Sequence, residues 1–127
     1  MSGFYGSIAH HDVVSEVYYG TDYHSHLGTK RGGMAFFDDN HNTFVRSIHS
    51  LENSYFRNKF EDELPRFKGK SGIGIISDTD SQPILLNTHL GMFALVTTSR
   101  INNLEELTER FLNKGEQFME NSQGFTN

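Results

Sequence analysis

The sequence contains no cysteine. This absence excludes disulfide bonds, thiolate metal sites and a cysteine nucleophile. The sequence also lacks any run near the roughly 18 apolar residues that a membrane-spanning helix needs, and its N-terminus lacks the basic-then-apolar pattern of a secretion signal. Positive charge is scarce, because 11 lysines and arginines face 16 aspartates and glutamates and leave a net charge of −5. We therefore expect a cytoplasmic protein that contacts neither a membrane nor nucleic acid.

The 127 residues are enough for a single domain with one core, and 35% of them are hydrophobic. Three apolar runs lie close together, at Gly72–Ile76, Ile84–Leu86 and Met92–Val96. Short runs of this kind are typical of buried strands, and we expect all three in one sheet. The segment Ser77–Gln82 joins the first two runs and carries hydroxyl and carboxylate side chains, so we expect it to form a functional edge of that sheet.

The rest of the chain alternates between extended and helical spacing. The expected elements are a strand at Gly3–Ile8, a helix from Asp12 to Tyr19 ended by Gly20, a loop at Thr21–Gly33, a hairpin of Met34–Phe37 and Thr43–Ile48, a helix through Phe56, Phe60 and Leu64 ended by Pro65, and a last helix, capped by Asn102 or Asn103 and ended by Gly115, that carries Leu104, Leu107, Phe111 and Leu112. This order predicts an α+β fold with a largely antiparallel sheet.

Histidines and aspartates suggest metal sites, which we weigh against plainer interpretations. His24 and His26 could share a metal ion, but a zinc site needs three or four ligands and nothing in the sequence fixes the third. We interpret them as loop histidines on a polar surface. Asp78 and Asp80 could bind a cation, yet such spacing is common in turns, where aspartate accepts hydrogen bonds from its own backbone. We predict no metal ion and no cofactor.

Glycines at positions 28, 32 and 33 surround Lys30 and Arg31 and could cradle an anion. Neither of the two common glycine-rich phosphate motifs is present. We therefore favour a flexible basic loop here. At the N-terminus, removal of Met1 would leave Ser2 with a hydroxyl and an α-amine together, and such an amine can act as a general base at its ordinary pKa of roughly 7.7–8.0.

An ordered set of short motifs runs through the whole chain. It consists of Met1-Ser2-Gly3-Phe4-Tyr5-Gly6, Tyr18-Tyr19-Gly20, His26-Leu27-Gly28 followed by Gly32-Gly33-Met34-Ala35, Gly69-Lys70-Ser71-Gly72-Ile73-Gly74, Ser81-Gln82-Pro83-Ile84, and the segment from Ala94 to Leu107. In this order the set resembles the glutaminase domain of class II glutamine amidotransferases, and most of all that of amidophosphoribosyltransferases.

The resemblance implies the αββα sandwich of N-terminal-nucleophile hydrolases, incomplete within this stretch of chain. Residues 1–127 would then be the N-terminal part of one glutaminase-type domain. The longer protein would continue into a phosphoribosyltransferase domain, a glycosyltransferase of purine biosynthesis. The resemblance leaves open whether copies of the chain form a homo-oligomer, since strands missing from the central sheet would leave edges able to pair.

The resemblance also places residues of other kinds where the family has its chemistry. Ser2 stands at the position of the cysteine nucleophile, and Leu27, between His26 and Gly28, stands at that of a loop arginine. An aspartate of the family that holds the amine of glutamine would fall near Gly124–Asn127.

Two further departures concern the substrate pocket. Ser77 and Asp78 stand where the family has an arginine, which binds the substrate carboxylate, and a tyrosine. Thr98 and Ser99 stand where it has the asparagine and glycine of the oxyanion hole. Loss of one oxyanion-hole donor alone costs roughly 10²–10³ in rate. We therefore predict a pseudoenzyme, a domain that does not hydrolyse glutamine and acts structurally or as a regulatory, ligand-binding module. The alternative is an active amidohydrolase whose nucleophile is Ser2 after removal of Met1.

Overall fold

The structure is a computed structural model that describes residues 2–25 and 30–115. Its elements, in chain order, are β1 (Gly3–Ile8), α1 (Val14–Tyr23), β2 (Arg31–Asp38), β3 (Thr43–Ser50), α2 (Phe56–Phe60), the 3₁₀ helix η2 (Glu61–Arg66), β4 (Ser71–Ser77), β5 (Ile84–Thr88), β6 (Gly91–Leu95) and α3 (Leu104–Asn113). None of the helices in these two ranges has the length and apolarity needed to cross a membrane. The predicted α+β class is confirmed.

Four strands form an antiparallel sheet in the order β1-β4-β2-β3. The strand β4 therefore lies between β1 and β2, although it follows both of them in sequence by more than thirty residues. The predicted strand Gly3–Ile8 and the predicted hairpin are confirmed, and the hairpin strands are longer than expected because β2 already begins at Arg31. Residues 31–33, which we assigned to a loop, thus belong to the sheet.

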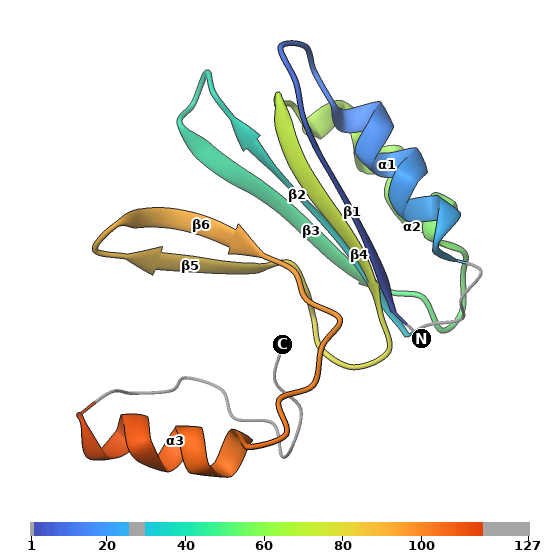
Figure 1. The fold of residues 1–127 in the computed structure, drawn as a ribbon. Coiled ribbons are helices and arrows are strands. Elements are labelled where there is room, and N and C mark those ends of the chain that lie inside the picture. The colour runs from blue at the N-terminus through green and yellow to red at the C-terminus, as the bar shows by residue number, and fades with distance from the viewer. Residues whose placement is uncertain (1, 26–29, 116–127) are drawn as a thin grey trace.

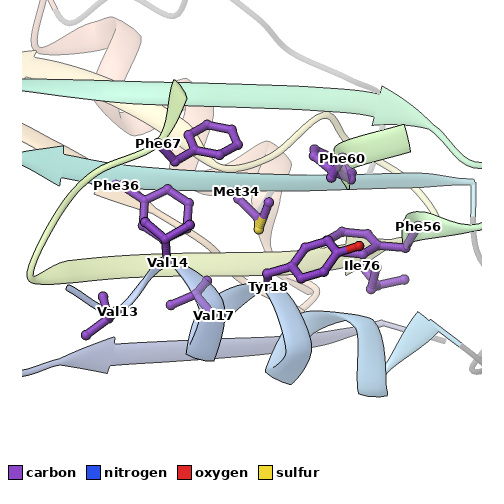
Figure 2. Packing of buried hydrophobic residues seen from close by; sticks show 10 residues of the cluster. All are labelled: Val13, Val14, Val17, Tyr18, Met34, Phe36, Phe56, Phe60, Phe67 and Ile76. Carbon is purple, nitrogen blue, oxygen red and sulfur yellow. The ribbon is translucent and has the colours of Figure 1, made fainter. Parts of the chain in front are cut away.

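The helices α1 and α2 cover one face of this sheet (Figure 1). The apolar face predicted for the first helix is confirmed, since Val13, Val14, Val17 and Tyr18 are all buried. They meet aromatic side chains of α2 and of β2 in the core shown in Figure 2. Within it, the rings of Phe56 and Phe60 lie 4.4 Å apart. Full burial of one such side chain contributes roughly 1.5–3 kcal/mol, so this layer holds the four-stranded sheet and its helices together.

The prediction that all three apolar runs lie in one sheet is wrong. Only β4 belongs to the four-stranded sheet, while β5 and β6 pair with each other in a separate two-stranded sheet. Much of this hairpin is exposed, including Met92 and Phe93. Apolar runs of this length mark extended chain but do not say which strands pair. Figure 1 shows the hairpin on the side of the main sheet away from α1.

Two expected helix ends are also wrong. Gly20 lies inside α1 and does not end it. A glycine is needed at this position because α1 packs so closely on β1 that a methyl group here would lie 2.5 Å from Cγ of Tyr5. Pro65 lies inside η2 and does not follow a longer α-helix. The α-helix spans only Phe56–Phe60 before it tightens into the 3₁₀ turn, which tolerates this proline.

The last predicted helix is confirmed as α3, and Gly115 follows it with a φ of +85°, the conformation expected of a glycine at a helix C-terminus. None of its residues is buried, and Phe111 and Leu112 remain 41% and 53% exposed. Its apolar face is therefore only partly buried within the described part of the chain.

Gly74 tests how tightly α1 packs on β4. A methyl group at this position would lie 1.9 Å from Oγ1 of Thr21, which is fully buried and has no hydrogen-bond partner among the described residues. We expect Gly74→Ala to destabilise the protein by roughly 1–3 kcal/mol through overpacking, measured by urea unfolding. Gly6→Ala is the matched control, because its added methyl would lie 3.4 Å from the nearest atom. Equal losses in both variants would contradict the packing.

Candidate functional site

The start of β1, the end of β4 and the start of β2 meet at one edge of the four-stranded sheet. The register pairs Gly3 with Ile76 and Arg31 with Ser77. If the β1–β4 register is continued by one residue, Ser2 lies opposite Ser77, on the side of β4 away from β2. Directly opposed residues of antiparallel strands share a face, so Ser2, Ser77 and Arg31 form one line across three strands, which we call the edge row. Its outer members are two strand spacings apart, roughly 10 Å.

The edge row lies on the face of the sheet away from α1 and α2. Ile76, the neighbour of Ser77, belongs to the core under the helices, and successive side chains of a strand alternate between faces. Farther along the same face lies an apolar groove of about 450 Å³. It is lined by residues of all four strands of the sheet and by β6, including Gly6, Ala35, Phe37, Phe44, Ile73 and Phe93. The row is thus the polar end of an apolar surface.

The hydroxyl of Ser2 meets the segment that follows β4. The backbone N–H of Asp78 donates a hydrogen bond to Oγ of Ser2 at 3.4 Å. This contact joins residues 76 positions apart in sequence. Ser2 and the pair Ser77–Asp78 were grouped in one pocket only by the resemblance, and the structure brings these residues together.

The segment Ser77–Gln82 is organised by its own hydroxyl groups. The side chain of Ser77 is buried, and its Oγ accepts a hydrogen bond from the backbone N–H of Thr79 at 3.2 Å. Nη1 of Arg31 donates to Oγ of Ser81 at 2.6 Å, so the guanidinium of β2 holds the far end of the segment. The segment is therefore tied to the sheet from both neighbouring strands.

Gln82 anchors the end of this segment. Its side chain is 1% exposed, its Nε2 donates to the carbonyl of Thr97 at 3.0 Å, and its Oε1 accepts from the N–H of Thr97 at 2.8 Å. The backbone approaches β2 so closely that a methyl group on Gly33 would lie 1.9 Å from the carbonyl oxygen of Gln82. Arg46 adds a hydrogen bond from Nη1 to the carbonyl of Pro83 at 3.1 Å. A side chain at position 33 would therefore collide with the backbone of Gln82, so glycine is required there.

Thr98 and Ser99 follow directly after this anchor, and both are exposed. The backbone N–H of Ser99 donates to Oγ1 of Thr97 at 3.2 Å, and the hydroxyls of Thr97 and Ser99 lie 2.6 Å apart. The N–H of Ser99 is therefore engaged in a local turn.

The structure brings some of the residues of the predicted pocket near one another. It places Ser2, Ser77 and Asp78 at one edge, and it ties the Thr98–Ser99 segment to the same loop through Gln82. His26, Leu27 and Gly28 lie outside the described residues.

Sequence reasoning weighed two further residues, Arg31 and His24, but did not place them at this edge. Arg31 was assigned to a flexible loop but occupies β2 opposite Ser77. The ring of His24, at the end of α1, packs against Gly3, where an added methyl would lie 3.0 Å from its Cγ. Arg31 could have been found only from the strand register, since the two glycines after it weaken the strand signal.

No three histidine, aspartate or glutamate side chains gather closely enough to hold a metal ion anywhere in residues 2–25 and 30–115. Among these residues, the edge row therefore offers hydroxyls, a guanidinium and backbone N–H groups as its means of binding a ligand. Such groups recognise polar or anionic molecules through hydrogen bonds.

Gln82→Met tests the anchor, because it keeps a long side chain but removes the partners that Gln82 gives to the N–H and carbonyl of half-buried Thr97. We expect a loss of stability of about 1–3 kcal/mol, which is roughly the cost of one unsatisfied buried group, since water reaches Thr97 in part. Unfolding in urea at pH 7 measures it.

Gln82→Glu is the matched variant, since it keeps the acceptor for Thr97 N–H and replaces the donor by an oxygen. The folded state favours its neutral form, which can donate to Thr97, so its pKa is raised on folding and stability is lost as pH rises above the pKa of the unfolded chain. We expect the variant to be closer to wild type at pH 4 than at pH 7. A pH-independent difference would contradict the double hydrogen bond.

Comparison with known proteins gives no matching family model and no matching curated protein. Two solved structures are similar. One is the glutamine phosphoribosylpyrophosphate amidotransferase from B. subtilis complexed with ADP and GMP, with a TM-score of 0.77 and 22% identity over 98% of this chain and 27% of that chain. The other is described as the allosteric regulatory enzyme of purine biosynthesis, with a TM-score of 0.75 and 22% identity over 94% of this chain and 26% of that chain. This chain thus spans about a quarter of each, and shares its fold with that part of them.

Proposed function

We propose that these residues are the N-terminal part of a glutaminase-type domain that does not hydrolyse glutamine and serves as a structural or regulatory, ligand-binding module. The observation that carries the proposal is the hydrogen bond from Asp78 N–H to Ser2 Oγ. It sets the residue at the nucleophile position beside an acidic segment, where the resemblance expects an arginine to bind the carboxylate of the substrate.

The two residues that follow Ile76 do not supply the positive charge that would bind the carboxylate of glutamine. An arginine at position 77 would attract the α-carboxylate through two hydrogen bonds, whereas Ser77 is neutral and Asp78 adds a negative charge beside it. A like charge near the binding group selects against the substrate as well as failing to attract it.

The oxyanion site is also altered. By the resemblance, Thr98 and Ser99 stand where donors would stabilise the tetrahedral intermediate. The N–H of Ser99 instead donates to Oγ1 of Thr97 within the same turn. Loss of one such donor costs roughly 10²–10³ in rate, so this turn alone argues for a large loss of turnover.

The proposal extends to the longer protein. The two similar structures are about four times the length that this chain matches, and one is named a phosphoribosylpyrophosphate amidotransferase. We accordingly expect the chain to pack against a downstream phosphoribosyltransferase domain in a cytoplasmic enzyme of purine biosynthesis, where ammonia would come from another source.

The second candidate is an active amidohydrolase that uses Ser2 after removal of Met1. Two features favour it. Ser2 immediately precedes β1 and its Oγ already accepts an N–H, and the imidazole of His24 packs beside Gly3, the next residue. A serine with a terminal amine as its base can act as a nucleophile.

Ammonia release from glutamine separates the two candidates. We expect the full-length protein, with its mature terminus defined by mass spectrometry, to release ammonia no faster than its Ser2→Ala variant. The matched control is Ser7→Ala, a change of the same kind at a half-buried serine of β1 whose hydroxyl donates to Glu16. Release that falls in Ser2→Ala but persists in Ser7→Ala would establish the hydrolase and reject the inactive module.

A further inference from the structure

Three tyrosines of α1 and of the start of α2 are open to solvent. Tyr19 and Tyr23 lie one turn apart on α1, and Tyr55 is the N-cap residue of α2. Their exposed fractions are 57%, 73% and 80%. The ring of His24 packs nearly perpendicular to that of Tyr23 and still leaves it largely exposed. We call these three tyrosines the tyrosine patch, since exposed apolar surface that is concentrated in one place commonly marks contact with another molecule.

Contacts between the two helices hold the patch together. Cζ of Arg57 lies over the ring of Tyr19, 5.5 Å from its centroid. The ring of Phe56, the residue after Tyr55, lies 5.9 Å from the ring of Tyr18. The hydroxyl of Tyr18 also donates a hydrogen bond to the carbonyl of Arg57 at 3.3 Å. The start of α2 is therefore fixed against the second half of α1, where the other two tyrosines of the patch lie.

We propose that the tyrosine patch is a docking surface for another protein and that it binds arginine side chains of that partner. The face of a tyrosine ring attracts a cation, and a guanidinium also stacks on it through its planar surface. The chain itself makes this contact where Arg57 covers one face of Tyr19. Tyr23 and Tyr55 are more exposed than Tyr19 and offer the same kind of surface to a partner. Tyrosine and arginine are also among the residues that most often carry the binding energy of protein interfaces.

The charge around the patch favours a cationic partner. Residues 14–23 and 52–62, which carry the patch, hold five carboxylates and two cations. The carboxylates are those of Glu16, Asp22, Glu52, Glu61 and Asp62, and the cations are those of Arg57 and Lys59. Arg57 is already engaged, since its Nε donates to Oδ2 of Asp22 at 2.6 Å. This layer is therefore net negative, as is the whole chain with its charge of −5.

Two of these carboxylates are available to a partner. Glu61 and Asp62 are exposed and make no ion pair within residues 2–25 and 30–115, whereas Glu16 is engaged by neighbouring side chains. Burial, followed by the negative charges of Glu61 and Asp22, raises the pKa of Tyr18, so these charges act at the junction of the two helices. A second copy of this chain would bring the same excess of negative charge to the contact, which disfavours it as the occupant.

Fluorescence anisotropy of a labelled peptide of alternating arginine and glycine, titrated with the full-length protein, tests this docking surface. We expect saturable binding at an ionic strength of about 0.15 M, where attraction between distant exposed charges is largely screened. Tyr23→Ala and Tyr55→Ala should each weaken binding about two- to fivefold, which is the effect of losing one exposed cation–π contact. A peptide of alternating lysine and glycine should bind less tightly, because an ammonium lacks the planar surface that stacks on a ring.

Matched variants separate the patch from general attraction to a negatively charged protein. Phe4→Ala removes an exposed ring from the opposite face of the main sheet and should bind the arginine peptide like the wild type. Glu61→Gln should weaken binding, whereas Glu105→Gln removes an exposed carboxylate from α3 and should leave binding unchanged. Unfolding curves in urea verify that each variant is folded.

Absence of binding to the wild type, or equal binding by the wild type and both tyrosine variants, would overturn the docking surface. Equal affinity for the arginine and lysine peptides would overturn stacking on the rings. A dimer of the wild type that is lost in Tyr23→Ala and Tyr55→Ala, measured by sedimentation, would replace the cationic partner by a second copy. Ammonia release does not bear on this surface, because the patch lies outside the edge row and the proposal holds whether or not glutamine is hydrolysed.

Discussion

The two hydrogen bonds between the side chain of Gln82 and the backbone of Thr97 hold the second half of the structure in place. The side chain of Gln82 is buried and satisfies both the N–H and the carbonyl of Thr97, which is itself half-buried. On one side the anchor rests on β2 at Gly33, with no room for a methyl group. On the other side it joins the chain just before β5 to the chain just after β6, and so fixes the base of the β5–β6 hairpin and the position of Thr98 and Ser99. The loop at the edge row and the Thr98–Ser99 turn are positioned by this one amide.

The candidate site illustrates how a sheet collects groups that are distant in sequence. Ser2, Ser77 and Arg31 come from three separate strands, and the antiparallel register alone lines them up. Under the proposed function, the glycines and the Gln82–Pro83 pair match the family that the sequence resembles, whereas the groups expected to touch a substrate are of other kinds. A shared fold thus fixes where a site lies and leaves open what it does.

Local patterns predicted most of the elements and few of the contacts. The spacing of Val13, Val14, Val17 and Tyr18 identified α1 because one helical face meets one core. Gly20 was misinterpreted as a helix end, because a glycine is required there by the ring of Tyr5 in β1, which leaves no room for a side chain. Gly32 and Gly33 hid the start of β2 for the same reason, as each makes room for a distant group, Phe56 or Gln82. The edge row could be identified only from the pairing of β4 with β1 and β2, and the spacing of apolar residues in the sequence does not reveal which strands pair.

The strand order also determines when the site can exist during synthesis. The strand β1 is made first, yet within the described sheet it pairs only with β4, and Gly3 meets Ile76 across more than seventy residues. The β2–β3 hairpin and the helix α1 can form from local contacts as they leave the ribosome, whereas β1 must wait for β4. Closing so long a loop carries an entropic cost before any contact offsets it. The edge row is therefore assembled by the least local pairing in the sheet, and in a nascent chain its three residues do not meet until β4 is in place.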